Sequence, residues 1–408
     1  MCHVLNQAVA SVPKTDRRRL LSMAGLGAAG IAAAGVAGAA PAAASPGRRG
    51  RLEQGRGKVP GGAGRRTRVV MLGTAGGPAL VDPDRHGVST AIVYEDKVYV
   101  VDLGVGSFNR LEQSGLAPDT GLGSSLSWVR GIFFTHLHSD HTVDWPAVYA
   151  TGSMNIVERA GDPIQVFGPG SRDTLTRVYP PTRPAPALVN PEDPTPGISS
   201  MTRHLRNAFA QDFNDRLRDS NFPDPDSLFQ VHDIDHSGLW TVDPQGIPPR
   251  LDAPIRVWED GDVKVTATLV DHRPTAPAYG FRFDTPDGSV VVSGDTCVSQ
   301  NLIDLARGAD VLVHEVIDPA FVDQLTASLP PGTAESVREH LLISHTTIEQ
   351  VGRDVAEPAG VGTLALTHMV PGTAPTSTWR KAQRGFSGEL VIGEDLLEIG
   401  VGRARWRA

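Results

Sequence analysis

Short apolar runs, each bounded by glycine, proline or acidic residues, recur along residues 68–408. The runs that predict β-strands are Arg68–Leu72, Thr90–Tyr94, Lys97–Leu103, Gly131–Thr135, Ile164–Gly168, Ile255–Trp258, Val263–Val270, Tyr279–Phe283, Ser289–Ser293, Asp310–Val316 and Gly362–Thr367. Runs of this length are typical of buried strands. Helical patterns occur at Pro146–Ser153 and Asn301–Arg307, and a capping box at Thr346–Glu349 predicts a helix to about Ala356. The pattern predicts an α/β protein with two sheets packed face to face and helices outside.

Residues 171–250 interrupt this rhythm with many prolines. Within this segment an apolar residue recurs at every fourth position, namely at Met201, Leu205, Phe209, Phe213 and Leu217. The spacing predicts one amphipathic helix. The segment is therefore interpreted as an insertion, either packed on the body of the protein or forming a mobile cap over the active site.

The N-terminus has the pattern of an export signal. Asp16-Arg17-Arg18-Arg19-Leu20-Leu21 precedes an Ala/Gly-rich stretch, and small residues end at Ala44. This resembles a twin-arginine signal peptide over residues 1–44, cleaved after Ala44, followed by a flexible basic linker over 45–67. A membrane anchor is the alternative, but the stretch is interrupted by glycine and too weakly apolar for a stable span. We therefore expect the twin-arginine machinery to export the chain to a periplasmic or extracellular location, without a stable membrane span.

Charge divides unevenly along the chain. The net charge is −8, yet residues 1–68 are basic, which leaves −18 on residues 69–408. Binding to a phosphate backbone rests on a surface of Lys and Arg. The acidic body therefore predicts that nucleic acid is an unlikely partner. Cys2 and Cys297 are the two cysteines and cannot form a disulfide framework.

A dense cluster of ligand-type residues follows the apolar run Gly131–Thr135. It comprises His136, His138, Asp140 and His141. Imidazole nitrogen and carboxylate oxygen are ligands that Zn²⁺ prefers. In an extended segment His136 and His138 point the same way, so both can bind one ion, and a following turn frees the other two residues for a second ion.

Four ligands cannot complete a two-metal site, so other strand ends should supply more. Three apolar runs end in ligand-type residues: His272 with its neighbour Asp271, then Asp295, and finally His368. Each lies where a loop leaves a predicted strand, which is where functional sites are commonly built.

These segments together resemble the metallo-β-lactamase fold hydrolases, in particular the ribonuclease Z and arylsulfatase-like branch. The matching motifs are His136-x-His138-x-Asp140-His141, Asp271-His272-x-Pro274-x-x-x-x-Tyr279-Gly280-Phe281, Ser293-Gly294-Asp295-Thr296, Leu366-Thr367-His368, Leu72-Gly73-Thr74 and Asp102-Leu103-Gly104. The resemblance covers residues 68–408 and implies an αββα four-layer sandwich with 171–250 as an inserted helical and loop segment. It also implies two Zn²⁺ ions, with Mn²⁺ or Fe as alternatives.

The resemblance further implies a division of the ligands. It gives one ion to His136, His138 and His272, the other to Asp140, His141 and His368, and a bridging position to Asp295. A metal-bridging hydroxide would then attack the substrate. Asp140 could orient this nucleophile and accept its proton. His345 and Glu315 resemble the His/Glu pair of the ribonuclease Z branch and are the candidates for protonating the leaving group.

The predicted function is an exported binuclear-zinc hydrolase of a small-molecule ester: a phosphodiester, an aryl sulfate or a lactone. Phe209, Phe213 and Trp240 are candidates for lining its substrate pocket. The alternative is a ribonuclease Z-like endoribonuclease or phosphodiesterase, disfavoured by the acidic body, the export signal and the 171–250 insertion. An iron redox enzyme of the same fold and a non-catalytic binding module are minor alternatives. The oligomeric state, a homodimer included, stays open.

Overall fold

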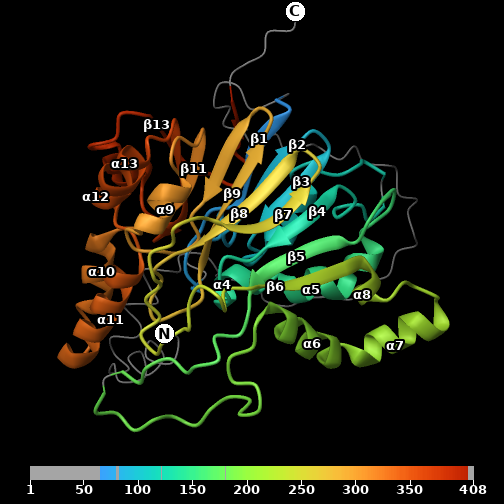
Figure 1. Cartoon of the computed structure of the whole chain (residues 1–408), viewed down its shortest axis with the longest axis horizontal. Helices are drawn as coiled ribbons and strands as arrows, with labels where there is room; N and C mark the ends of the chain where they lie inside the picture. The colour runs from blue at the N-terminus through green and yellow to red at the C-terminus, as the bar shows by residue number, and fades with distance from the viewer. Residues whose placement is uncertain (1–64, 80–81, 121, 180, 403–408) are drawn as a thin grey trace, which may run out of the picture.

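The computed structural model describes residues 65–79, 82–120, 122–179 and 181–402. Within these ranges two seven-stranded mixed sheets pack face to face, and helices cover the outer face of each sheet (Figure 1). The predicted α/β four-layer architecture is thereby confirmed. The predicted signal peptide and most of the predicted linker lie outside the described residues.

The first sheet contains the N-terminal strands. In spatial order it consists of β14 (Glu398–Gly400), β1 (Thr67–Gly73), β2 (Ser89–Tyr94), β3 (Lys97–Val101), β4 (Val129–Phe133), β5 (Ile164–Pro169) and β6 (Phe229–Ile234). The pairs from β14 to β3 are antiparallel, and the pairs from β3 to β6 are parallel. Glu95 and Asp96 form the two-residue turn that joins β2 to β3, with Tyr94 opposite Lys97.

The second sheet repeats this change from antiparallel to parallel pairing. Its order is β13 (Glu389–Ile392), β12 (Thr363–Val370), β11 (Val311–Ile317), β10 (Gly288–Val292), β9 (Tyr279–Thr285), β8 (Val263–Leu269) and β7 (Ile255–Asp260). Strands β10 to β13 are parallel, so their carboxyl ends reach the same edge of the sheet. That edge carries the site described below.

Helices form the outer layers. Those beside the first sheet are α3 (Ser107–Gln113), α4 (Ser139–Thr142), α5 (Trp145–Thr151), η1 (Gly152–Met154), α6 (Ile198–Ala208), α7 (Ala210–Asp219) and α8 (Pro225–Leu228). Those beside the second sheet are α9 (Gln300–Leu305), α10 (Pro319–Thr326), α11 (Pro331–Ser344), α12 (Ile348–Gln350), η2 (Val351–Ala356), α13 (Glu357–Ala359), α14 (Thr376–Trp379) and η3 (Arg380–Gln383). Among these described helices, none combines the length and apolar character needed to cross a bilayer.

Among the described residues the hydrophobic core has four clusters: three fill the spaces between the layers, and a smaller fourth joins α10 and α11 to the end of β11. Between the sheets Phe133 packs edge-on against Phe281 and Phe283, with ring centroids 5.5 and 5.2 Å apart. A second hydrophobic cluster around Trp145 joins the first sheet to its helices, and a third around Trp379 does the same for the second sheet. Strands buried on both faces read as continuous apolar runs, which explains why their positions could be predicted from the sequence.

The predicted single helix over Met201–Leu217 is two helices, α6 and α7, separated at Phe209. A spacing of four residues drifts by roughly 40° per step around a helix of 3.6 residues per turn, so a straight helix would carry the apolar stripe off its packing face. The break at Phe209 corrects this drift. The stripe packs against the cluster around Trp145, with Phe213 buried and its ring 5.8 Å from that of Tyr149. The contacts agree with the interpretation in which this segment packs on the body.

The predicted capping box lies one residue later than expected. Thr347 and Gln350 form it, and α12 begins at Ile348. Thr346 is unavailable because its hydroxyl donates to the carbonyl of Thr296 at 2.7 Å and its N–H donates to Glu315. Tertiary hydrogen bonds therefore occupy the polar groups of Thr346, the residue that the local motif predicts as the helix cap.

Asp260 at the end of β7 links the two sheets. Its carboxylate accepts hydrogen bonds from Tyr99 Oη at 2.8 Å and Arg130 Nε at 3.0 Å, and Lys97 Nζ lies 3.4 Å away. Burial by itself would raise the pKa of Asp260, but the hydrogen bonds from Arg130 and Tyr99 lower it below its ordinary value.

We expect Asp260→Asn to lower the free energy of unfolding at neutral pH by about 2 kcal/mol, since it leaves partly buried cations without their counter-charge. A carboxylate with a lowered folded-state pKa stabilises the fold above its unfolded-state pKa of about 3.9, and that contribution disappears as the pH falls through the folded-state value. The difference between wild type and variant in urea unfolding should therefore shrink on acidification. Asp262→Asn is the control, because Asp262 is exposed and accepts one bond from Tyr94. Equal losses in both variants would contradict this role.

Candidate metal centre

The seven predicted metal ligands meet at the edge where the parallel strands end. The chain leaves β4 at Phe133, passes His136 and His138 in extended conformation, and turns into α4, which carries Asp140 and His141. Of the other three predicted ligands, His272 follows β8, Asp295 follows β10, and His368 lies within β12. Residues from both sheets thus converge on one site.

Two glycines permit this convergence. Gly294, which precedes Asp295, has a φ of +61°, and a Cβ there would lie 2.7 Å from the Tyr279 carbonyl oxygen. At Gly76 a Cβ would lie 2.5 Å from His368 Nδ1. A side chain at either position would displace a ligand loop.

Three imidazoles form the first ligand cluster. His138 Nδ1 lies 3.0 Å from His136 Nε2 and 3.2 Å from His272 Nε2. Burial lowers the pKa of His136 and His272 well below the ordinary value, and it lowers the pKa of His138 to about 4. All three rings are therefore neutral near pH 7 and direct nitrogen lone pairs at a common point, an arrangement that a cation would stabilise.

The second cluster combines carboxylates and imidazoles. His368 Nε2 lies 3.4 Å from Asp140 Oδ2 and 3.3 Å from Asp295 Oδ2, and His141 Nε2 lies 3.3 Å from the same Asp295 oxygen. Asp295 Oδ2 also lies 3.9 Å from the Nε2 atoms of His136 and His272 in the first cluster. Asp295 is thus within reach of both clusters, in the position expected for a bridging ligand.

Partners behind the ligands fix the orientation of the rings. His141 Nδ1 donates to Asp102 Oδ2 at 2.8 Å, and His272 Nδ1 donates to the Ser344 carbonyl at 2.9 Å. Thr275 Oγ1 lies 2.8 Å from His138 Nε2. Because their outer nitrogens donate hydrogen bonds, the rings of His141 and His272 are held in fixed orientations, and the inner nitrogen of the neutral His272 ring keeps its lone pair.

Charges in the second cluster also suit cation binding. Burial by itself would raise the pKa of Asp295, but the neighbouring His368 and His141 lower it well below its ordinary value. Burial would likewise raise the pKa of Asp140, which its hydrogen bond with His368 and the charge of His141 lower instead. Both carboxylates are therefore ionised, as metal ligands must be.

Buried polar atoms at this site lack protein partners. His141 Nε2 and Asp295 Oδ1 are buried without a hydrogen bond. Most buried polar atoms in folded proteins are paired, so these two call for a missing ligand. With mixed nitrogen and oxygen donors in two adjoining sets, the described residues fit two divalent cations of the zinc class.

Glu315 and His345 lie together beside the clusters. His345 Nδ1 is 3.2 Å from Glu315 Oε1 and 3.9 Å from Asp295 Oδ2. Glu315 is 1% exposed, and its Oε1 also accepts the backbone N–H groups of Thr296 and Thr346. Burial would lower the pKa of His345, but the charge and hydrogen bond of Glu315 raise it to about 9. Glu315 therefore acts through His345 and is too buried to meet a substrate itself.

The predicted pocket residues lie in packing positions. Phe209 and Phe213 belong to the cluster between the first sheet and its helices, and Trp240 packs against the core between the sheets. Cys297, two residues after Asp295, is half-buried, and burial together with Asp271 raises the pKa of its thiol to about 12. A neutral thiol is a poor ligand, so Cys297 is not counted among the metal ligands.

Two positioning residues escaped the sequence analysis. Asp102 was noted only as part of a strand motif, although it accepts both Thr135 N–H and Thr135 Oγ1 as well as His141 Nδ1. Thr275 gave no signal, since a single threonine in a loop is common. The signal that could have identified Asp102 is its position: it is a carboxylate at the end of a predicted strand, as the histidine cluster is at the end of another.

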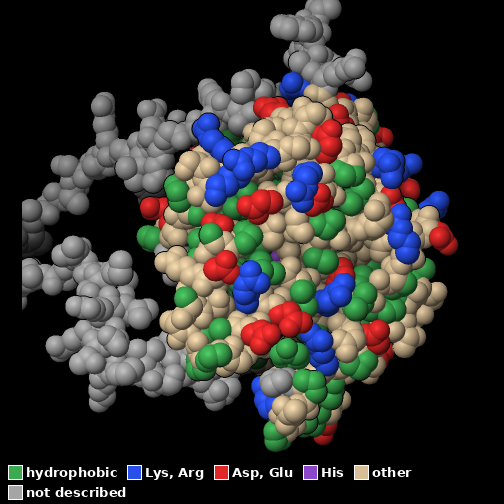
Figure 2. All heavy atoms as spheres, turned by 90° about the vertical axis from the view of Figure 1, so that its left-hand side faces the viewer, with side chains coloured by type: hydrophobic (Ala, Val, Ile, Leu, Met, Phe, Trp, Pro, Cys, Tyr) green, Lys and Arg blue, Asp and Glu red, His purple; other side chains and the backbone are tan. Residues whose placement is uncertain are grey.

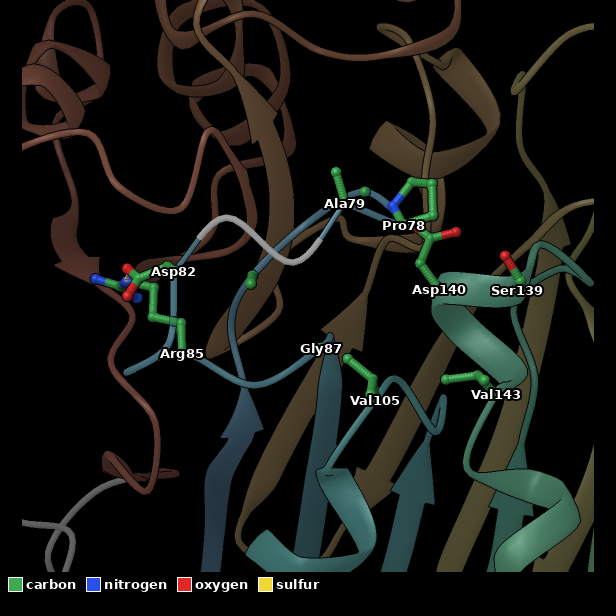
Figure 3. A pocket seen from close by; sticks show the side chains of 11 residues that line it. Pro78, Ala79, Asp82, Arg85, Gly87, Val105, Ser139, Asp140 and Val143 are labelled. Carbon is green, nitrogen blue, oxygen red and sulfur yellow. Dashed lines mark ion pairs between the residues drawn. The ribbon is translucent and has the colours of Figure 1, made fainter. Parts of the chain in front are cut away.

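A pocket of about 190 Å³ opens beside Asp140 (Figure 3). Pro78 and Ala79 lie on one side of it, and Val105 and Val143 point into the same space from the other. Asp82 and Arg85 lie at its far end, where Arg85 donates to Thr74 Oγ1 and the Gly393 carbonyl. The pocket gives a substrate an apolar approach to the second cluster.

Removal of divalent cations with a chelator should abolish hydrolysis and lower the melting temperature by roughly 5 °C or more, since ligands that bind only the folded state stabilise it by mass action. Adding zinc should restore both. The measurement is metal content by mass spectrometry beside differential scanning fluorimetry. A chelated protein that keeps its activity and its melting temperature would rule out a metal centre.

Comparison with known proteins gives consistent matches. The family model described as "Metallo-beta-lactamase superfamily" matches residues 82–334. Ribonuclease Z of Mycobacterium avium (strain 104) is 30% identical over 336 residues, covering 82% of this chain and 98% of that protein. Ribonuclease Z of Mycobacterium bovis (strain BCG / Pasteur 1173P2) is 29% identical with the same coverage.

Solved structures agree on the fold. The human short form of tRNase Z superposes with a TM-score of 0.50 at 19% identity, covering 82% of this chain and 99% of that one. The long form of RNase Z from yeast gives a TM-score of 0.50 at 13% identity, covering 82% of this chain and 42% of that one. The predicted enzyme class, a metal-dependent hydrolase of ester or phosphodiester bonds, is confirmed by the matches.

One prediction is contradicted. Nucleic acid was expected to be an unlikely partner and a small-molecule ester the substrate, whereas the relatives are named as ribonucleases. The error lies in reasoning from total charge: −18 over residues 69–408 does not specify where the surface cations lie. The ribonuclease Z side of the predicted resemblance is supported, and the arylsulfatase-like side is not.

Proposed function

The chain belongs to the metallo-β-lactamase superfamily, and on that premise we propose that it is a two-metal phosphodiesterase that cleaves RNA in the manner of ribonuclease Z. The observation that carries the proposal is the pair of ligand clusters within reach of Asp295, with His345 and Glu315 alongside. Identity of 30% along nearly the whole of a ribonuclease Z supports RNA as the substrate class.

Two zinc ions are proposed as the cofactors, with Mn²⁺ or Fe as alternatives. His136, His138 and His272 would hold one ion, and Asp140, His141 and His368 the other, with Asp295 between them. When bound, two such cations supply an activated water and neutralise charge on a phosphate group. Histidine at position 138 adds a nitrogen donor, in keeping with zinc.

The residues of the chain divide the remaining work. Asp140 lies at the mouth of the apolar pocket and can accept a proton from the attacking water (Figure 3). His345, held by Glu315, is placed to donate a proton to the leaving ribose oxygen. Asp102 and Thr275 keep the imidazoles of His141 and His138 in place.

The test compares substrates of matched linkage. Zinc-loaded protein is incubated with a labelled RNA hairpin bearing a single-stranded 3′ extension, with the same sequence as DNA, and with an aryl sulfate. We expect cleavage of the RNA at a defined position, much slower cleavage of DNA, and no sulfate release. His138→Ala should be inactive and Cys297→Ala active. Sulfate release without RNA cleavage would refute the proposal.

Export is proposed separately and rests on the pattern at residues 1–44, which lie outside the described part of the chain. We expect the full chain in a host with a twin-arginine system to accumulate outside the cytoplasm and to begin at Ser45. Arg17→Lys combined with Arg18→Lys should retain it inside. Cell fractionation and N-terminal sequencing measure both results, and equal distribution of the two proteins would contradict export by this route.

A further inference from the structure

We propose that Arg380, Lys381 and Arg384, here called the η3 patch, form a surface that binds the phosphate backbone of the RNA substrate. This inference rests on the proposed function and adds to it a second region of contact, outside the metal centre. None of the three residues lies in the ligand clusters or in the pocket beside Asp140.

The η3 turn is fixed to the protein by its other residues. Trp379 and Ala382 are buried at 0% and 1% exposure, and Trp379 Nε1 donates to the Ala374 carbonyl at 3.2 Å. Gln383 Nε2 donates to the carbonyls of Phe386 and Gly388, which holds the turn that follows. Because the anchoring residues face inward, the three cations are exposed on the outside of the turn.

The cations of the η3 patch lack acidic partners within the described residues. The segment from Pro371 to Gly388 contains no Asp or Glu. Exposed arginines elsewhere are commonly paired: Arg203 with Asp193, Arg307 with Asp304, and Arg338 with Asp323. Three neighbouring unpaired cations on an otherwise acidic body repel one another and favour a polyanion.

The η3 patch lies next to elements of the chain that begin near the catalytic residues. The turn follows β12, which carries His368, within the crossover from β12 to β13. It packs against the segment α12 to η2, which begins shortly after His345, and a Cβ at Gly385 would lie 3.0 Å from Arg353 Cβ.

These contacts place the η3 patch beside a helix that begins close to the site. At a helical rise of about 1.5 Å per residue, Arg353 lies roughly 8 Å along that helix from its first residue, Ile348. Figure 2, which views the side of the molecule with these helices, shows Lys and Arg side chains in its upper part with Asp and Glu side chains among them.

A polyanion is the occupant that these observations favour. The η3 patch offers three exposed cationic side chains, which suit phosphate groups better than a folded protein partner. Such contacts carry no sequence information and position the substrate. The metal centre would then cut RNA held partly by the η3 patch.

The test replaces all three residues in the full zinc-loaded chain: Arg380→Gln, Lys381→Gln and Arg384→Gln. Binding of a fluorescent RNA hairpin is followed by anisotropy at salt concentrations from about 50 to 200 mM, and initial rates on RNA and on bis(4-nitrophenyl) phosphate are measured in parallel. The control variant carries Arg203→Gln, Arg307→Gln and Arg338→Gln, which removes equal charge from arginines that are paired with acidic residues.

We expect the η3 variant to bind RNA at least tenfold more weakly at low salt, and to lose about 2 to 3 from the slope of log affinity against log salt, since each phosphate contact contributes roughly 0.7 to 0.9. Its rate on bis(4-nitrophenyl) phosphate should equal that of wild type, and the control variant should change little in either measurement. If the triple variant loses the small-substrate rate as well, the three single variants replace it, each expected to remove about 0.7 to 0.9 of slope.

Unchanged RNA affinity and salt slope in the η3 variant would overturn the inference, whether or not RNA is cleaved. Failure of the wild type to cleave RNA would instead refute the proposed function, because binding and cleavage are measured separately. Equal weakening by the control variant would also overturn the inference, since it would show a general effect of charge.

Discussion

Replacing Asp295 with alanine is expected to lower the rate of phosphodiester hydrolysis by about 10³-fold or more and to reduce the bound metal below two ions per chain. Asp295 Oδ2 lies 3.3 Å from His141 and His368 and 3.9 Å from His136 and His272, so one oxygen serves both clusters. Its removal takes away the shared ligand. It also leaves the two histidines of the second cluster without the charge that raises the pKa of His141.

Two comparisons make this result specific. Cys297→Ala changes a half-buried residue two positions further on, and we expect full activity and two metal ions from it. His138→Ala removes a ligand from the first cluster only, so we expect one ion to remain with activity lost. Metal counting by mass spectrometry and rates on bis(4-nitrophenyl) phosphate measure these variants together. An Asp295→Ala protein with two ions and a wild-type rate would contradict the bridging role.

The sequence predicted this group of ligand-type residues because their chemistry is local. Imidazoles and carboxylates that directly follow apolar strands can be recognised one strand at a time, and in parallel strands their common edge follows from topology. Thr275 and the Ser344 carbonyl could not be found this way. They hold His272 and His138 through tertiary contacts made by the loop after β8 and by the end of α11. No periodic pattern in the sequence indicates such contacts.

Local rules failed where tertiary contacts competed with them. Thr346 satisfies the pattern of a capping residue, yet its hydroxyl and N–H are used by Thr296 and Glu315. The strand β6 (Phe229–Ile234) was missed because it is an edge strand with exposed positions, and so lacks the continuous apolar run of its neighbours.

The net charge gave a wrong prediction about nucleic acid for a related reason. Composition adds charges that the fold separates, and several acidic residues, among them Asp102, Asp295 and Glu315, are buried at or beside the metal centre. The cations of the η3 patch remain exposed. An acidic chain can therefore present a local basic surface, and the charge argument against RNA loses its force.

We expect His345→Ala to lower the rate of hydrolysis more for substrates with a poor leaving group than for substrates with a good one. An alkoxide leaving from RNA needs a proton, whereas 4-nitrophenolate leaves readily without one. We therefore expect the variant to lose about 10² to 10⁴-fold in kcat on RNA and less than about tenfold on bis(4-nitrophenyl) phosphate. Metal content should stay at two ions per chain, because each cluster keeps its three ligands and Asp295.

Glu315→Gln tests how His345 is held. The amide is close in shape to the carboxylate and its oxygen can still accept the N–H groups of Thr296 and Thr346, but it lacks the charge that stabilises the protonated imidazole. We expect the same selective loss on RNA, smaller than in His345→Ala, with unchanged melting temperature. His345 also lies close to His272 and Asp295, a geometry that would suit a metal ligand. Equal losses on both substrates together with a missing ion in His345→Ala would show that it binds metal, and would remove it as the proton donor.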